Sequence, residues 1–522
     1  MKHSIKSLLH SFYAYHTYYT LTMAMIVCIS SFVNEIDNSQ ISFMEAFFLG
    51  ITTATNTGLV TFDFSILKPT TQYIVMVASE LCGVYFASTL IPSFFRFFRL
   101  KKLIKEKHEY KHNHETKMDE TSTSYQSDSD DGTSFQIITS EVEPLRFDYK
   151  LELTSLKYFI FILLGYGIIF KLFGFITILI ECFTSSEVND ILTDENINIP
   201  FFAAFQTISA WNNLGITLNY NGLIPLMKSE TIVLTSTILN MSGNIMIPII
   251  VRIFVFVLHR LFEPRSQNFV KPKPLLYILK APTRMSLYFF SATQTKLLFV
   301  VQLLLIFLQM SFFVLFNTDD SISGLYVGFA HSSFTRTAGF TIVNLRDINP
   351  AINMTYILSM FISAYPIVIL RKLRDNVVYQ TSGLLPAQSN VTTILQYFKN
   401  LFFSHVIWWY TISMIIMAIY SMTTTTASNN LIDVLFEVSS ALGTVGMSMG
   451  SYKSCASFSA DLPVTGQLII CVVMILGRHR GFPTHCYPLD YYKIWEKIRK
   501  DEKNSNQGSN EMLKPLTSKY TI

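Results

Sequence analysis

Four short polar loops in this sequence each contain a glycine, and the backbone of such a loop could bind an ion. They read TNTGL, NNLGI, RTAGF and TVGMS, and their glycines are Gly58, Gly215, Gly339 and Gly446. A phenylalanine stands ten residues before each glycine: Phe48, Phe205, Phe329 and Phe436. A hydroxyl stands six residues before each: Thr52, Ser209, Ser333 and Ser440. Because positions four apart share one face of a helix, the sequence predicts one helix-and-loop unit used four times.

Four such loops around one axis predict an ion pore. Rings of inward-pointing backbone carbonyls can replace the water around a dehydrated cation. Glycine suits such a loop because it adopts positive φ angles that a Cβ would penalise. The helix before each loop would direct its negative C-terminal end at the axis. The alternative for one loop alone is a glycine helix cap in an ordinary bundle, and the fourfold recurrence favours the pore.

The composition places the chain in a lipid bilayer. Half of its 522 residues are hydrophobic and only 15% are charged, which is typical of an integral membrane protein. The net charge of +4 is small for this length, and the basic residues of the chain flank apolar runs. Nucleic acid is therefore not a predicted partner. Six scattered cysteines form no disulfide or zinc pattern. No nucleotide-binding signature and no catalytic residue set is present, so the sequence predicts neither an enzyme nor a cofactor.

Eight apolar segments are long enough, or nearly so, to cross a hydrocarbon core of ~30 Å. They lie near residues 12–33, 72–98, 156–182, 231–258, 297–316, 351–370, 401–421 and 463–477. Each pair brackets one loop. The predicted fold is therefore all-α and membrane-integral, with four tandem span, pore-helix, filter, span repeats. Eight transmembrane helices and four re-entrant pore loops would surround a pseudo-fourfold axis, where a non-helical loop is tolerated.

The predicted repeats occupy residues 1–100, 151–262, 296–374 and 399–490. Cytoplasmic linkers would lie at 263–295 and 375–398, with a cytoplasmic tail at 491–522. Residues 101–150 are polar and rich in charge and serine, which predicts a disordered cytoplasmic loop. Basic residues beside the spans fall on one side and indicate the cytoplasm. Acidic residues on the other side, such as Glu187 and Glu195, either concentrate cations or are simply solvated.

Three polar residues at membrane depth are candidates for the ion pathway, because such groups are costly there. Glu80 lies in the second span, and its alternative role is to pair with a neighbouring helix. Asn244 follows Gly243 and precedes Pro248, a combination that predicts a kink. Arg478 closes the last span and could project into the path below the filter, where it would repel a cation. Its alternative role is that of a positive-inside anchor.

The stretches TNTGLVTFD, SAWNNLGITLN, SFTRTAGF and ALGTVGMSMG together resemble the Trk/Ktr/HKT superfamily of cation transporters across all four repeats. GRHRGFP and SAYPIVILR resemble its fungal Trk-type branch. The resemblance implies that Gly58, Gly215, Gly339 and Gly446 are filter glycines. It also implies that the preceding residues, Thr57, Leu214, Ala338 and Val445, bind K⁺ through their carbonyls. Arg478 matches the positive residue that forms a barrier in related proteins.

The resemblance further implies potassium uptake through the plasma membrane, down the electrochemical gradient, by a lipid-embedded chain that commonly forms a homodimer. Symport with Na⁺ or H⁺ stays open, and no separate regulatory subunit is indicated. Sodium-preferring plant HKT members carry serine in place of the first glycine, so Gly58 favours potassium. The alternatives are a sodium or mixed-cation HKT-like transporter and, in another class, a non-conducting membrane receptor or scaffold.

Overall fold

The computed structural model describes residues 41–105, 149–263, 273–316, 325–370, 406–421 and 431–479, apart from 99, 103, 287, 363–365, 368, 453 and 455. These residues belong to one compact unit of the chain. Helices are the regular elements of the described part, which confirms the predicted all-α class. The predicted first span at 12–33, the linker at 375–398, the tail and most of the 101–150 loop lie outside the described residues.

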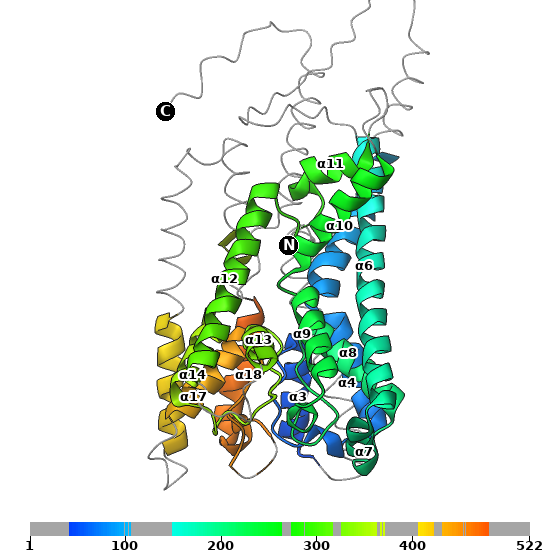
Figure 1. Cartoon of the computed structure of the whole chain (residues 1–522). Helices are drawn as coiled ribbons and strands as arrows, with labels where there is room; N and C mark the ends of the chain where they lie inside the picture. Colours follow the sequence, from blue (N-terminus) through cyan, green and yellow to red (C-terminus); the bar gives the residue numbers. More distant parts are fainter. Residues whose placement is uncertain are drawn as a thin grey trace, which may run out of the picture. The chain divides into compact units, whose positions relative to one another are not determined.

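A short helix precedes each of the four glycines. These helices are α3 (Phe43–Thr55), α8 (Ile199–Asn212), α13 (Leu325–Phe334) and α17 (Leu431–Gly443). Their 10 to 14 residues give lengths of roughly 15–21 Å, too short to cross a core of ~30 Å. In Figure 1 all four stand in the lower half of the view. A capping box of Ser42 and Glu45 fixes the start of α3, and Asn198 caps α8.

Within the described residues, three helical segments are long and apolar enough to cross a membrane: Pro69–Lys102, Lys150–Thr184 and Ala292–Phe316. The first contains α4 (Pro69–Cys82) and a π-helix, η2 (Val84–Leu90). The others are α6 (Tyr149–Thr184) and α12 (Ala292–Phe316). Many large apolar side chains on α6 and α12, such as Leu172 and Phe307, are exposed. This exposure fits helices that face lipid tails.

The predicted kink at Gly243-Asn244 is confirmed. Helices α9 (Glu230–Gly243) and α10 (Ile247–Phe262) are bent by 82° at this point and count as a fourth span when taken together. Pro248 lies in the first turn of α10, where its missing N–H costs nothing. Shorter apolar helices are α14 (Pro350–Ile362), Val406–Ser421 and α18 (Val464–His479). The count of eight spans stays a prediction.

The packing of the helices connects the four repeats in a circle. Helix α8 packs against α4, α6 and α9, and α13 packs against α9 and α12. Helix α17 packs against α14 and α18, and α18 in turn packs against α3. The last repeat therefore contacts the first. The predicted linker at 263–295 contains a further short helix, α11 (Pro274–Lys280), which packs against α6 and α10.

Candidate functional site

All four predicted filter glycines have left-handed backbone conformations. Their φ angles are +96° at Gly58, +77° at Gly215, +66° at Gly339 and +91° at Gly446. Residues with a Cβ rarely adopt these angles, whereas glycine does so without steric cost. The recurrence of glycine therefore has a conformational cause in every loop.

The four glycines lie in a closed ring of loops. A Cβ added to Gly58 would overlap the carbonyl oxygen of Leu214, and one added to Gly215 would overlap that of Ala338. The same relation joins Gly339 to the Val445 carbonyl, and Gly446 to the Thr57 carbonyl. Each glycine thus packs against the carbonyl that precedes the next glycine, and the fourth loop returns to the first. The structure brings together all eight residues that the sequence predicts as ion ligands. Four independent helix caps would not need to contact one another in this way.

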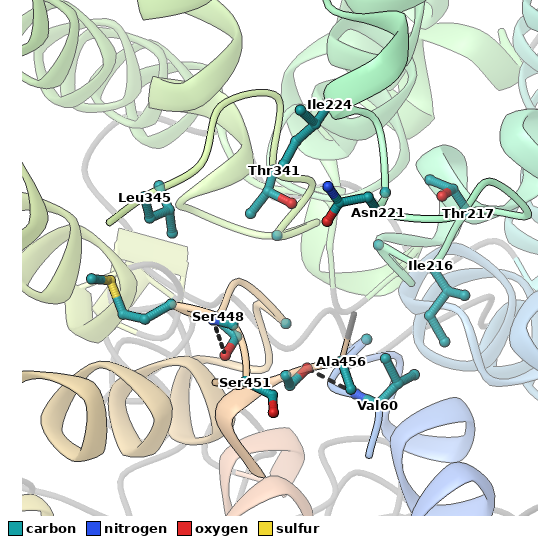
Figure 2. A pocket seen from close by; sticks show the side chains of 18 of the residues that line it. Val60, Ile216, Thr217, Asn221, Ile224, Thr341, Leu345, Ser448, Ser451 and Ala456 are labelled. Carbon is teal, nitrogen blue, oxygen red and sulfur yellow. Dashed lines mark hydrogen bonds between the residues drawn. The ribbon is translucent and has the colours of Figure 1, made fainter. Parts of the chain in front are cut away.

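A cavity of about 370 Å³ adjoins this ring and is lined by residues from all four loops. Figure 2 shows Val60, Thr217, Thr341 and Ser448, one from each repeat, around it. At ~30 Å³ per water molecule the cavity has room for about 12 waters. A cation could therefore keep its hydration shell until it reaches the ring.

Hydroxyl and amide groups provide most of the polarity of this cavity. Among its described lining residues Asp63 is the acidic one and Arg346 the basic one. The acidic residues of α7 (Ser186–Asp194) and Glu195 do not line it. Glu187 instead forms an exposed ion pair with Lys228, 2.8 Å between Oε1 and Nζ. Whether these acidic residues concentrate cations or are simply solvated stays open.

The hydroxyl six residues before each glycine has a role that sequence reasoning missed. Thr52 Oγ1 accepts a hydrogen bond from the Gly58 N–H at 2.9 Å, and Ser440 Oγ accepts one from the Gly446 N–H at 3.0 Å. In the other two loops the hydroxyl bonds elsewhere: Ser209 donates to the Ile216 carbonyl, and Ser333 accepts from Asn240. The fixed spacing was the signal, because it places the hydroxyl beside the loop.

Left-handed residues two positions before the glycine turn the chain out of three of the helices. They are Asn56, Asn213 and Thr444, with φ angles of +48°, +60° and +52°. Asparagine adopts this conformation more readily than most residues with a Cβ, and here it ends the helix. The third loop differs, since its Gly339 N–H donates to the Phe334 carbonyl at 2.8 Å and its turn contains the buried Arg336.

Glu80 is held in a network behind the second pore helix. Its carboxylate forms an ion pair with Lys171 of α6 and accepts a hydrogen bond from Asn212 Nδ2 of α8 at 2.8 Å. The Lys171 ammonium also lies 5.9 Å from the centre of the Trp211 ring, within cation–π range. This is the pairing that the sequence offered as the alternative role. Sequence reasoning missed Lys171, whose signal was a single charge inside an apolar span.

Asn244 and Arg478 lie at helix breaks and ends. Asn244 is half-buried at the bend between α9 and α10, and Gly243 beside it packs against the Trp211 carbonyl of α8. Arg478 donates a hydrogen bond to the Cys82 carbonyl at the end of α4. Its neighbour Gly477 packs against the last carbonyls of α17. Both residues therefore lie near the C-terminal ends of pore helices.

Residues 133–489 match a protein family whose model is described as TrkH, cation transport protein. This match covers more than half of the chain. The chain belongs to the TrkH family of cation transport proteins. The resemblance that the four motifs indicated is thereby confirmed, and the TrkH-family chain is a membrane protein. The matched residues include Gly215, Gly339 and Gly446. Gly58 lies before residue 133, and its place beside the other three glycines is shown by the contacts within the ring.

Relatives of this TrkH-family chain include two proteins of Schizosaccharomyces pombe. Potassium transport protein 1 is 27% identical over 347 residues and potassium transport protein 2 is 29% identical over 367, each match covering 64% of this chain and 41% of the relative. The low-affinity potassium transport protein of Saccharomyces cerevisiae is 25% identical, over 65% of this chain and 43% of the relative. The matches span about two-fifths of the length of these relatives. A similar solved structure, the potassium transporter TrkH from Vibrio parahaemolyticus, has a TM-score of 0.47 and 13% identity, covering 90% of this chain and 83% of that chain.

Proposed function

We propose that this TrkH-family chain takes up K⁺ across the plasma membrane through the ring formed by its four loops. The observation that carries the proposal is the circular contact in which each glycine packs against the carbonyl before the next glycine. The names of the curated relatives, which are potassium transport proteins, support K⁺ as the ion. The ion would move down its electrochemical gradient, without a cofactor and without an enzymatic step.

In this proposal the backbone carbonyls of Thr57, Leu214, Ala338 and Val445 replace the water around K⁺. Carbonyl oxygens can do so where the loop geometry holds them around the ion. The C-terminal ends of the pore helices carry partial negative charge and lower the energy of a cation beside them. The cavity next to the ring, whose polarity comes mostly from hydroxyl and amide groups, would deliver the ion with its water.

We propose that Arg478 forms a barrier on the pathway beyond the ring. Its guanidinium donates to the Cys82 carbonyl at the end of α4, and the neighbouring Gly477 packs against the C-terminal end of α17. A fixed positive charge here would repel a passing cation. Glu80 and Asn244 would shape the pathway indirectly, because Glu80 bonds Asn212 at the end of α8 and Gly243, next to Asn244, packs against the Trp211 carbonyl of α8. Arg478→Gln should raise inward K⁺ current several-fold at equal surface amount, whereas Arg260→Gln, which removes another basic residue, should not. An unchanged current in Arg478→Gln would overturn the barrier.

The finer architecture is part of the same proposal. Eight spans would surround four re-entrant loops, and two chains would form a homodimer in the lipid. The exposed apolar faces of α6 and α12 provide surfaces for lipid. Crosslinking in native membranes would test the dimer, and accessibility of single cysteines to membrane-impermeant reagents would test the number of spans.

The function is tested in a yeast or bacterial strain that lacks potassium uptake. We expect the chain to rescue growth on low K⁺, with K⁺ uptake exceeding Na⁺ uptake. We also expect Gly58→Ser, whose Cβ would overlap the Leu214 carbonyl, to lower K⁺ uptake and so raise the ratio of Na⁺ to K⁺ uptake. If Na⁺ uptake exceeds K⁺ uptake in the unmodified chain, it is an HKT-like sodium or mixed-cation transporter. If the chain reaches the surface and moves neither ion, it is a non-conducting receptor or scaffold.

A further inference from the structure

A buried carboxylate lies behind the fourth loop. Glu437, in the middle of α17, is 1% exposed. Its Oε2 accepts a hydrogen bond from Ser448 Oγ at 2.6 Å, and its Oε1 accepts from the Ser459 N–H at 2.9 Å and from Ser459 Oγ at 2.5 Å. A buried charge is costly unless such donors surround it. Three donors from the segment that follows Gly446 therefore converge on one side chain of the pore helix.

The bond to Ser448 fixes the shape of the loop. Ser448 follows Gly446 by two residues and lines the cavity. While it donates to Glu437, its Oγ accepts hydrogen bonds from the Gly450 N–H at 3.2 Å and the Phe458 N–H at 2.8 Å. Loss of the Glu437 acceptor would free the hydroxyl to rotate and weaken both of these bonds.

The same segment joins the fourth repeat to the first. The Val60 N–H donates to Ser457 Oγ at 3.0 Å, and the Ser457 N–H donates to the Val60 carbonyl at 2.9 Å. Val60 follows Gly58 by two residues, as Ser448 follows Gly446. Glu437 therefore holds, through Ser448 and Ser459, the segment that closes the ring between the last loop and the first.

The corresponding positions of the other repeats do not provide this support. Nine residues before the glycines stand Leu49, Gln206 and Ala330. Leu49 and Ala330 are apolar, and Gln206 donates to Ser236 Oγ of α9 at 3.1 Å rather than to its own loop. Of the four pore helices, α17 is the one with a carboxylate at this position, and its loop is the one that contacts the first loop.

We infer that Glu437 is a positioning residue that fixes the spacing between the fourth and first loops and so sets the preference for K⁺ over Na⁺. This inference rests on the proposed function. A ring of carbonyls discriminates between ions through its size and the number of dipoles it presents. With the fourth loop released, the ring adapts to the smaller Na⁺.

The test measures the K⁺/Na⁺ permeability ratio, from reversal potentials, of the full chain purified into liposomes. We expect Glu437→Gln to lower the ratio about tenfold while K⁺ still passes, because the carboxamide keeps the volume but has one acceptor oxygen, so it cannot accept from both Ser448 and Ser459. Ser448→Ala should lower the ratio by a similar factor. Ser448→Ala also removes the acceptor of the Gly450 and Phe458 N–H groups, so the double variant should add little to Ser448→Ala, in which the bond to Glu437 is already lost. Gln206→Leu is the matched control and should keep the unmodified ratio.

An unmodified chain that passes no cation refutes the proposed function itself, before any variant is compared. If the unmodified chain prefers K⁺ and both Glu437→Gln and Ser448→Ala keep that preference, the positioning role is wrong. Additive effects in the double variant would also overturn it. Should Glu437→Gln fail to fold, Ser448→Ala decides by itself, because it leaves the carboxylate and its two bonds to Ser459 in place.

Discussion

In the first and fourth loops the glycine N–H donates to a hydroxyl of the preceding pore helix, whereas in the second and third loops that hydroxyl bonds another group. In the first and fourth, the hydroxyls of Thr52 and Ser440 accept the N–H of the loop glycine. In the second, Ser209 donates to the carbonyl of Ile216, the residue after the glycine. In the third, Ser333 accepts its bond from Asn240 of α9. The hydroxyl six residues before the glycine therefore accepts the glycine N–H in two repeats and bonds a different group in the other two.

The difference has a cause outside the loops. Asn240 extends from α9 of the second repeat and bonds both Ser333 and Thr337 of the third, the latter at 2.6 Å. The third loop therefore depends on a neighbouring repeat for the support that the first and fourth obtain locally. The repeated motif determines the backbone conformation of the ring. The residues packed around each loop determine which side-chain hydrogen bonds hold it.

The largest effect is expected where the ring itself is altered. Gly446→Ala should reduce K⁺ uptake to the background of the uptake-deficient strain, because the new Cβ would overlap the Thr57 carbonyl at a φ of +91°. Uptake of a K⁺ tracer at matched surface amount measures this. Gly450→Ala is the control, since Gly450 has a similar φ of +83° but its Cβ would have the Ala456 oxygen as nearest atom at 4.0 Å. Equal losses in the two variants would mean that strain, not contact within the ring, matters.

The ring could be predicted from the sequence because its cause is local and repeated. A positive φ demands glycine at one position of each loop, and the helix before it places phenylalanine and a hydroxyl at fixed distances. Phe48, Phe205 and Phe436 are buried as such a pattern suggests. The bend after Gly243 was also predictable, since glycine and proline weaken a helix wherever they occur.

Other features depend on contacts between distant parts of the chain. Glu80 and Lys171 are 91 residues apart and meet only because α4 and α6 both pack near α8. The distinct turn of the third loop, with Arg336 buried in it, follows from packing that its sequence motif does not reveal. The sequence motifs do not single out Glu437, because its role depends on partners beyond its own helix. Ser448 lies in the motif TVGMS, but Ser459 lies 13 residues after Gly446 and reaches Glu437 only through the fold.

A smaller effect is expected when the fastening of the first or fourth loop is removed. Thr52→Val, which keeps the side-chain shape, and Ser440→Ala should each leave a buried glycine N–H without its acceptor. Such a loss costs about 1–3 kcal/mol. We expect the K⁺/Na⁺ permeability ratio to fall roughly tenfold, since 1.4 kcal/mol corresponds to that factor. Ser209→Ala should change the ratio less, because it removes a donor from a carbonyl and leaves the Gly215 N–H unaffected. If Ser209→Ala lowers the ratio as far as Thr52→Val, the two classes of loop do not differ in function.

The smallest effect is expected at Ser333. Ser333→Ala removes one bond from Asn240, whose side chain keeps its bond from Thr337. Because the buried Asn240 Nδ2 loses its acceptor, the cost should again be about 1–3 kcal/mol. We expect the melting temperature of the purified protein to fall by only a few degrees and the permeability ratio to stay within twofold. Asn240→Leu removes both bonds and should lower the melting temperature further. The two variants can be told apart by their K⁺ preference. If the preference drops in Asn240→Leu but not in Ser333→Ala, α9 of the second repeat supports the third loop through Thr337. An unchanged preference in both would show that this loop keeps its position through its backbone bonds alone.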